Sequence, residues 1–232
     1  MVFGLRNYIR TFFLILIPLM ITPLLGIYEG SAFRFAQVEY DGPWDPRPRA
    51  YQRLLSLLEL RTSVRTEAER VSVRLDDPVL FNYPFIYMAG GEDFEPLSDG
   101  ERKNLRKYIK SGGTVLIDDV SGVDNSRFDS RIREELSLVI PEEPLRRLPG
   151  EHVIYKSFYL LNYASGRKIV DSGLEGITFT DEDRTAVIYS RNDLGGAWSE
   201  DEFGKWEYEC VPGGETQREM ALRLGVNIVL YA

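Results

Sequence analysis

The sequence predicts an α/β fold, a three-layer sandwich in which a mostly parallel sheet lies between two layers of helices. Short apolar runs alternate along the chain with segments of helical periodicity, and this alternation favours right-handed βαβ units. Glycines or prolines separate most of these segments, as is typical of turns between core elements. No repeat or flexible linker interrupts residues 33–232, so they are expected to form one domain.

The predicted strands are short, apolar or alternating in polarity. They are residues 33–40, 69–75, 84–91 and 114–118, followed by a hairpin over residues 175–193. The predicted helices carry apolar residues at helical spacing. They are residues 49–60, 98–111, 126–140 and 215–232. Ser98 stands three residues before Glu101, which is the spacing of a capping box. Residues 152–161 mix strand and turn features.

The first 32 residues differ from the rest of the chain. Two arginines precede an uncharged apolar run, residues 11–27, and the small residues 30–32 follow it. This order is typical of a signal peptide that is cut after Ala32. An uncleaved inner-membrane anchor is the alternative, although Pro18 and Pro23 disfavour a regular spanning helix. Both interpretations predict a periplasmic or other extracytoplasmic location for residues 33–232 and limit membrane contact to residues 1–32.

Composition excludes several classes of function. The formal net charge of -8 provides no basic footprint for nucleic acid. The single cysteine, Cys210, allows no internal disulfide. The glycines of "GGEDFEPLSDG" are accompanied by acids rather than by a lysine, so this segment is not expected to bind phosphate. No cofactor is predicted.

A ligand site is expected at the carboxyl ends of the strands, where open α/β sheets bind their ligands. The segments that follow the predicted strands are rich in carboxylates, glycines and aromatic residues. The aromatic residues are candidates for stacking on a sugar or peptide, or for packing in the core. The candidate binding residues are Tyr40, Trp44, Gly90, Gly91, Asp93, Asn192, Asp193 and Trp198.

The adjacent carboxylates Asp118 and Asp119 dominate this predicted edge. Three interpretations stay open: a Mg²⁺ or Ca²⁺ site shared with Asp93 and Asp193, paired-carboxylate catalysis, and capping of the following turn. No calcium-loop spacing supports the first interpretation, and no metal ligands are assigned. Since neighbours on a strand face opposite sides, we expect one aspartate to face a cleft and the other to cap the turn.

His152 is the only histidine, so any Ser-His-Asp or Cys-His system must include it. The chain has no G-x-S-x-G elbow, and a histidine just after a Pro-Gly turn also suits a structural role. The catalytic residues therefore stay unassigned, with Asp118, Asp119 and His152 as candidates. Cys210, which lies close to a proline and glycines, is expected to be a partly packed thiol in a loop.

Four segments resemble an uncharacterised bacterial domain family: "FRFAQVEYDGPWDPRP", "DPVLFNYPFIYMAGGEDFEPLSDGERKNLRKYIKSGGTVLIDD", "AVIYSRNDLGGAW" and "RLGVNIVLYA". Members of that family occur as exported single-domain proteins. They also occur at the C-terminus of aerotolerance-type membrane proteins, near genes for MoxR-type ATPases and von Willebrand factor A domains. The resemblance implies a flavodoxin-like fold similar to that of class I glutamine amidotransferases, and it implies no established reaction.

The likeness to amidotransferases is limited to the scaffold. Those enzymes carry a cysteine at a strand-to-helix elbow, where this chain has "IDDVSG", so glutamine hydrolysis is not expected. Many family members read Gly-His where this chain has Gly90-Gly91. We therefore expect an exported, non-catalytic binding or assembly domain of the bacterial cell envelope, with a protein partner. The alternative is a hydrolase of an envelope glycan or peptide that uses Asp118 or Asp119 with His152.

Overall fold

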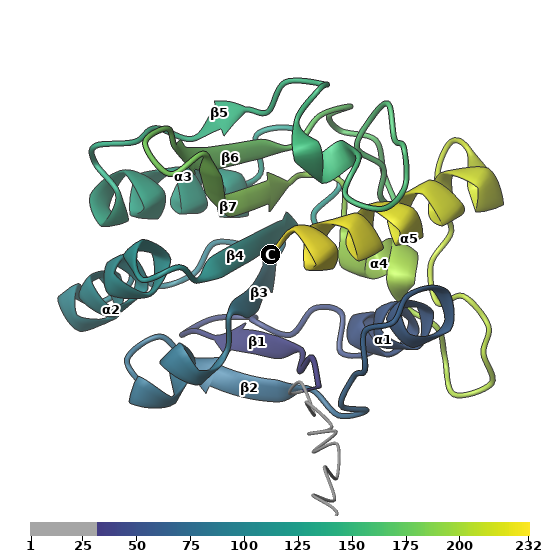
Figure 1. Ribbon diagram of the computed structural model, residues 1–232, viewed down its shortest axis with the longest axis horizontal. Helices are drawn as coiled ribbons and strands as arrows, with labels where there is room; N and C mark the ends of the chain where they lie inside the picture. Colours follow the sequence, from purple (N-terminus) through teal and green to yellow (C-terminus); the bar gives the residue numbers. More distant parts are fainter. Residues whose placement is uncertain (1–31) are drawn as a thin grey trace, which may run out of the picture. The chain divides into compact units, whose positions relative to one another are not determined.

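A mixed sheet organises the fold in the computed structural model, which describes residues 32–232 (Figure 1). Within these residues the sheet has seven strands in the order β2-β1-β3-β4-β7-β6-β5. The first five strands in this order run parallel, β6 is antiparallel to β7, and β5 is antiparallel to β6. The strands are β1 (Ala36–Glu39), β2 (Val71–Arg74), β3 (Phe85–Gly90), β4 (Thr114–Asp119), β5 (Arg146–Arg147), β6 (Glu175–Phe179) and β7 (Arg184–Ser190).

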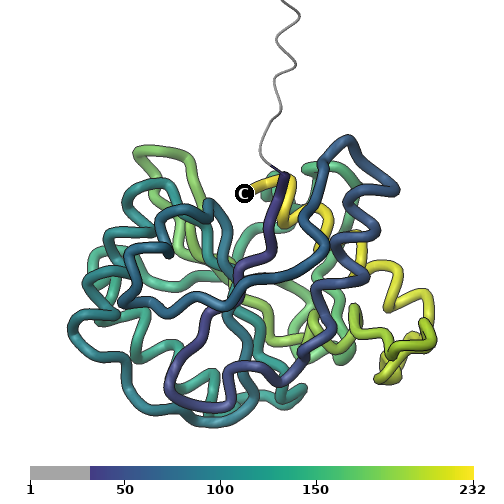
Figure 2. Tube along the Cα trace, turned by 90° about the horizontal axis from the view of Figure 1, so that it is seen from below, coloured from purple at the N-terminus to yellow at the C-terminus, as the bar shows by residue number. Residues whose placement is uncertain are grey.

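Helices cover both faces of the sheet and confirm the predicted α/β fold class. One face packs against α1 (Ala50–Arg61), α4 (Leu194–Trp198) and α5 (Gly214–Tyr231). The other face packs against α2 (Asp99–Lys110) and α3 (Arg127–Val139). Figure 2 shows the two layers on either side of the strands, with teal α2 and α3 on the left and blue α1 and yellow α5 on the right.

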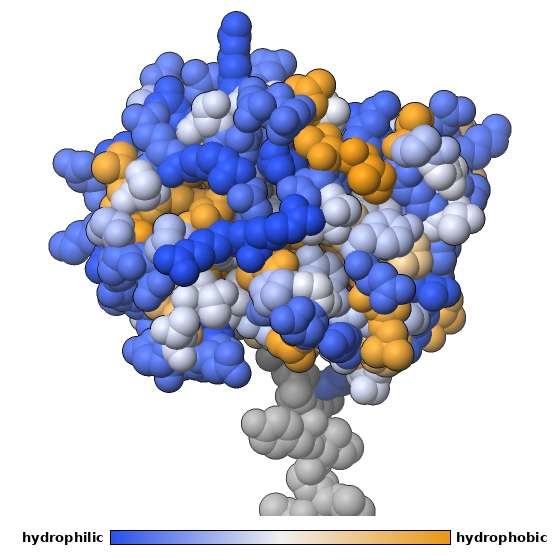
Figure 3. All heavy atoms as spheres, turned by 90° about the horizontal axis from the view of Figure 1, so that it is seen from above, coloured by the Kyte–Doolittle hydropathy of each residue, from blue (hydrophilic) through white to orange (hydrophobic). Residues whose placement is uncertain are grey.

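The strand β5 blunts one edge of the sheet. It has only two residues, Arg146 and Arg147, and Pro144 and Pro149 lie close to it in the sequence. A short edge strand with charges and nearby prolines discourages pairing with another chain. The face seen in Figure 3, on the β5 side of the molecule, is mostly hydrophilic with separate apolar areas.

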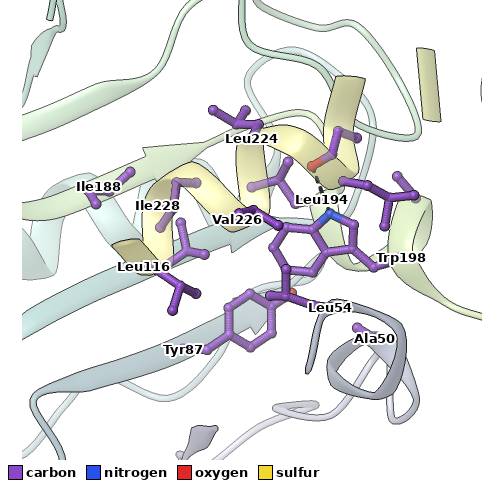
Figure 4. Close-up of a cluster of buried hydrophobic side chains, with 14 of the residues drawn as sticks. Ala50, Leu54, Tyr87, Leu116, Ile188, Leu194, Trp198, Leu224, Val226 and Ile228 are labelled. Atoms are coloured by element: carbon purple, nitrogen blue, oxygen red, sulfur yellow. Dashed lines mark hydrogen bonds between the residues drawn. The ribbon is translucent and has the colours of Figure 1, made fainter. Parts of the chain in front are cut away.

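Strand alternation divides the core into two clusters. In β3, Phe85 and Tyr87 point to the face of α1 and α5, whereas Ile86 and Met88 point to the face of α2 and α3. Trp198 lies within the first cluster, and its indole N–H donates to the Ala221 carbonyl at 2.9 Å (Figure 4). The side chains around it come from β3, β4, β7, α1 and α5.

Most of the predicted elements are present, and the capping box of Ser98 and Glu101 forms as expected. The sequence interpretation missed β5, α4 and the 3-10 helix η1 (Pro78–Asn82). Residues 152–161 contain the short 3-10 helix η2 (Val153–Tyr155) and turns, without a strand.

The predicted signal peptide or anchor at residues 1–32 falls almost entirely outside the described residues. Among residues 32–232, no helix combines the length and the apolar character that a membrane span needs. The export prediction therefore rests on the sequence pattern alone.

Candidate functional site

The carboxyl ends of β1, β3, β4 and β7 lie at one edge of the sheet because these strands run parallel. The register places Ala89 and Gly90 of β3 beside Asp118 and Asp119 of β4. It also places Asp118 beside Ser190 of β7. Predicted site residues from three separate segments thus lie at neighbouring strand ends, which is where this class of fold binds its ligands.

Asp118 is fully buried on the face of α1, α4 and α5. One carboxylate oxygen accepts the Leu194 N–H at 2.9 Å, and the other accepts the Gly195 N–H at 2.7 Å and the Tyr87 hydroxyl at 2.8 Å. Burial and, secondly, the charge of Asp193 raise the pKa of Asp118 to about 7, although these three donors oppose the rise. Asp118 therefore fastens the start of α4 to the ends of β3 and β4.

Asp119 is fully buried on the opposite face. One oxygen accepts the Ser121 N–H at 2.8 Å, and the other accepts the Ser126 hydroxyl at 2.5 Å. Ser126 in turn caps α3 by accepting the Asp129 N–H. Burial raises the pKa of Asp119. Asp119 thus caps the turn after β4, but the expectation that the other aspartate faces a cleft is wrong, because Asp118 is also buried.

Asp193 is a third buried carboxylate at this edge. It has a positive φ of 54° and caps α4 by accepting the Gly196 N–H at 2.8 Å. Arg47 donates to both of its oxygens, at 3.0 and 2.7 Å, and Arg167 donates to one of them. The guanidinium of Arg47 lies 4.2 Å from the centroid of the Tyr208 ring. Asp193 is therefore neutralised inside the protein by two arginines, as a buried charge requires.

The acids of this edge do not converge on a metal ion. Asp118, Asp119 and Asp193 face different protein donors, and Asp93 pairs with Arg131 at 3.0 Å. Within residues 32–232, no group of three or more His, Cys, Asp or Glu side chains is arranged to hold a metal. The interpretation of these four aspartates as Mg²⁺ or Ca²⁺ ligands has no geometric support.

His152 lies at the opposite end of the strands, near the start of β7. Its Nδ1 accepts the Ile154 N–H at 3.2 Å, and its Nε2 is 2.9 Å from the hydroxyl of Thr185, near the start of β7. Thr185 is about 16 Å along the strand from Ser190, the neighbour of Asp118. Burial lowers the pKa of His152. The structure therefore separates the histidine from the aspartates that it would need for catalysis.

Two of the aromatic candidates belong to the core. Tyr40 is 2% exposed, and its ring centroid lies 4.7 Å from that of Phe94. Trp198 is fully buried. A ligand has no access to either ring, so Tyr40 is not available as a binding residue and Trp198 is not available for stacking. Trp44 is half-buried, with the guanidinium of Arg70 5.8 Å from its ring centroid.

Two further candidates, Asn192 and Gly90, have structural roles, and Cys210 is packed as well. Asn192 is buried and accepts the N–H groups of Val170 and Asp171, so it shapes the loop before β6. Gly90 is enclosed so tightly that a Cβ atom there would lie 2.3 Å from the Phe128 ring. Cys210 is 5% exposed, and burial raises the pKa of its thiol, so it is more fully packed than expected.

An open cleft of about 370 Å³ lies at the carboxyl ends of β3 and β4, beside the start of α3. Its lining comes from the segments that follow these two strands and from the first residues of the helix. The lining residues are Gly91, Glu92, Asp93, Ser121, Val123, Ser126 and Arg127. Gly91 and Asp93 are thus the two predicted binding residues that line the cleft.

Sequence reasoning missed the arginines of this edge. Arg47 follows the first strand in "DGPWDPRP", and Arg127 begins a predicted helix, so their positions near the strand ends were available as a signal. Arg167 comes from the irregular segment before β6, and no periodicity marks it. The pairing of Arg167 with Asp193 becomes visible only in the fold.

A comparison with protein-family models finds a match over residues 34–232, to a family described as a domain of unknown function. The match includes every strand of the sheet and both helical layers. No protein with a curated description matches the chain.

Proposed function

The chain belongs to this family, DUF4159, and from that premise we propose that it is an exported binding or assembly domain of the bacterial cell envelope, which acts without catalysis. Its ligand or partner occupies the cleft at the carboxyl ends of β3 and β4. The apolar run at residues 11–27, with two arginines before it, supports export. Localisation of the full-length chain by cell fractionation tests this part of the proposal.

One observation carries the proposal of binding without catalysis. The conspicuous charges at the strand ends are already occupied inside the protein: Asp118 by backbone donors, Asp119 by a turn and a serine, and Asp193 by two arginines. Such groups stabilise the ends of β4 and the start of α4 rather than contact a substrate. The neighbouring cleft is open and combines apolar surface with a few charged and polar side chains, which suits recognition.

We also infer that the scaffold is related to that of class I glutamine amidotransferases. The parallel part of the sheet has the order β2-β1-β3-β4-β7. This order corresponds to the flavodoxin-like arrangement 2-1-3-4-5, whose ligands lie at the carboxyl ends of the strands. The position of the cleft agrees with that rule, whereas the separation of His152 from Asp118 gives no support to the hydrolase alternative.

Site-specific crosslinking in the native cells tests the binding function. Val123 lines the cleft and is 56% exposed, whereas Leu138 is 54% exposed and lies near the other end of α3. A photoreactive residue at position 123 should yield a discrete adduct with an envelope protein or ligand, and one at position 138 should not. Monomer alone from position 123, or the same adducts from both positions, would contradict the proposal.

A further inference from the structure

We infer that the cleft at the ends of β3 and β4 binds a zwitterionic ligand, a free amino acid or a short peptide. Glu92 contacts the ammonium group of this ligand, and Arg127 contacts its carboxylate. The inference rests on the proposed binding function and specifies the chemistry of the ligand. The evidence for it is the size of the cleft and the charges of the side chains that line it.

The cleft has the dimensions of a small-ligand site. Its volume of about 370 Å³ lies at the lower end of the range of about 300–1,000 Å³ that is typical of such sites. Gly91 lacks a side chain at one wall, and Val123 provides apolar surface at another. These residues leave room for a short aliphatic portion between two charged ends.

Three charged side chains line the cleft, and one of them is already paired. Asp93 lies 3.0 Å from Arg131, which lowers the pKa of Asp93, and the charge of Arg127 adds a smaller effect in the same direction. The side chains of Glu92 and Arg127 are exposed, and neither forms an ion pair or hydrogen bond with another residue of the described part of the chain. The cleft therefore presents one carboxylate and one guanidinium that are free of a hydrogen-bonded or ion-paired partner within residues 32–232.

These two free charges select for a ligand that carries both signs. A simple anion would be attracted by Arg127 but repelled by Glu92, and a simple cation would be attracted by Glu92 but repelled by Arg127. A zwitterion is attracted at both of its charged ends. Its carboxylate also lies favourably near the first turn of α3, a helix of 13 residues whose N-terminal end has a partial positive charge.

Calorimetric titration of the full chain with the dipeptide Ala-Ala tests the inference. N-acetylation removes the ammonium group of this probe, and C-amidation removes its carboxylate. Each modification should weaken binding measurably, by up to about fivefold, which is the effect of losing one exposed ion pair. L-alanine, titrated in the same way, distinguishes a free amino acid from a peptide as the preferred source of the zwitterion.

Two variants assign each end of the ligand to its residue. In Arg127→Gln the penalty for C-amidation should disappear while the penalty for N-acetylation remains, and Glu92→Gln should show the reverse. Arg146→Gln and Glu151→Gln are matched controls, because both residues are exposed and lie outside the cleft. Both controls should bind like the wild type.

The possible failures are distinguishable. If Ala-Ala and L-alanine do not bind, or if blocking either end has no effect, the zwitterion inference is overturned. The proposed function survives that result when position 123 still crosslinks a partner. If both probes fail and position 123 yields only monomer, the cleft is not a binding site at all.

Discussion

At the scale of single residues, Asp118 and Asp119 differ in how well the amide of an asparagine can take the place of the carboxylate. Asp118 accepts backbone N–H groups on both oxygens, so Asp118→Asn must direct its NH₂ group at one of these donors. Asp119 accepts an N–H on one oxygen and a hydroxyl on the other, and a hydroxyl can turn to accept from an amide. We expect Asp118→Asn to cost about 2–4 kcal/mol of unfolding free energy and Asp119→Asn about 1 kcal/mol. Urea unfolding near pH 8 measures both, and equal losses would contradict the assignment.

The buried position of Asp118 also predicts a pH dependence. Its pKa is raised to about 7 in the folded protein, compared with about 3.9 in an unfolded chain. Between these values the folded state binds more protons, so the contribution of Asp118 to stability falls as the pH rises. Asp118→Asn cannot titrate, so the stability difference between wild type and variant should narrow from about pH 5 to pH 8. Unfolding at several pH values tests this, and a difference that stays constant over this range would show that the carboxylate is ionised throughout.

The sequence was sufficient to locate these aspartates and to predict their opposite orientations, because strand periodicity determines both. Their burial could not be predicted in the same way. The partners of Asp118 lie 31 to 77 positions away in the chain, and their approach depends on tertiary structure. Similarly, Arg47 and Asp193 are 146 positions apart, so their ion pair leaves no local pattern.

At the scale of secondary structure elements, two adjacent glycines at the end of β3 have different roles. A Cβ at Gly90 would lie 2.3 Å from the Phe128 ring of α3 and 2.5 Å from the Tyr40 hydroxyl, whereas one at Gly91 would lie 3.2 Å from Val120. Gly90→Ala must therefore push α3 or β1 outward, at a cost of about 1–3 kcal/mol. Gly91→Ala should cost less than about 1 kcal/mol, because the contact is milder and the unfolded chain loses freedom. Thermal unfolding compares the two variants, and a larger loss for Gly91→Ala would contradict this view of the packing.

The elements that were predicted correctly have strong local signals. The start of α2 was visible in the spacing of Ser98 and Glu101, and both hydrogen bonds of the box are formed. The helix α4 was missed because its sequence is "LGGAW", and two glycines disfavour a helix. It forms because Asp118 and Asp193 accept its first N–H groups. The strand β5 was missed because two residues are too few for any periodicity.

At the scale of the whole molecule, one sheet joins two separate hydrophobic cores. Leu54 of α1 is fully buried in one core, and Ile132 of α3 is 2% exposed in the other. Alternate residues of β3, such as Tyr87 and Met88, contribute to different cores. Loss of packing on one face therefore weakens strands on which the other face depends. We expect both cores to unfold in a single cooperative transition.

The variants Leu54→Ala and Ile132→Ala test this coupling. Each should lower the free energy of unfolding by about 2–5 kcal/mol, and the double variant should approach their sum because the two side chains lie in different cores.

Trp198 and Trp206 lie in or against the core of Leu54, so tryptophan fluorescence follows mainly that face, whereas far-ultraviolet circular dichroism follows both. The two signals should change together in every variant. If Ile132→Ala shifted the circular dichroism transition and left the fluorescence transition unchanged, the two faces would be independent units. Since β3 and β4 are shared by both cores, we expect the transitions to coincide.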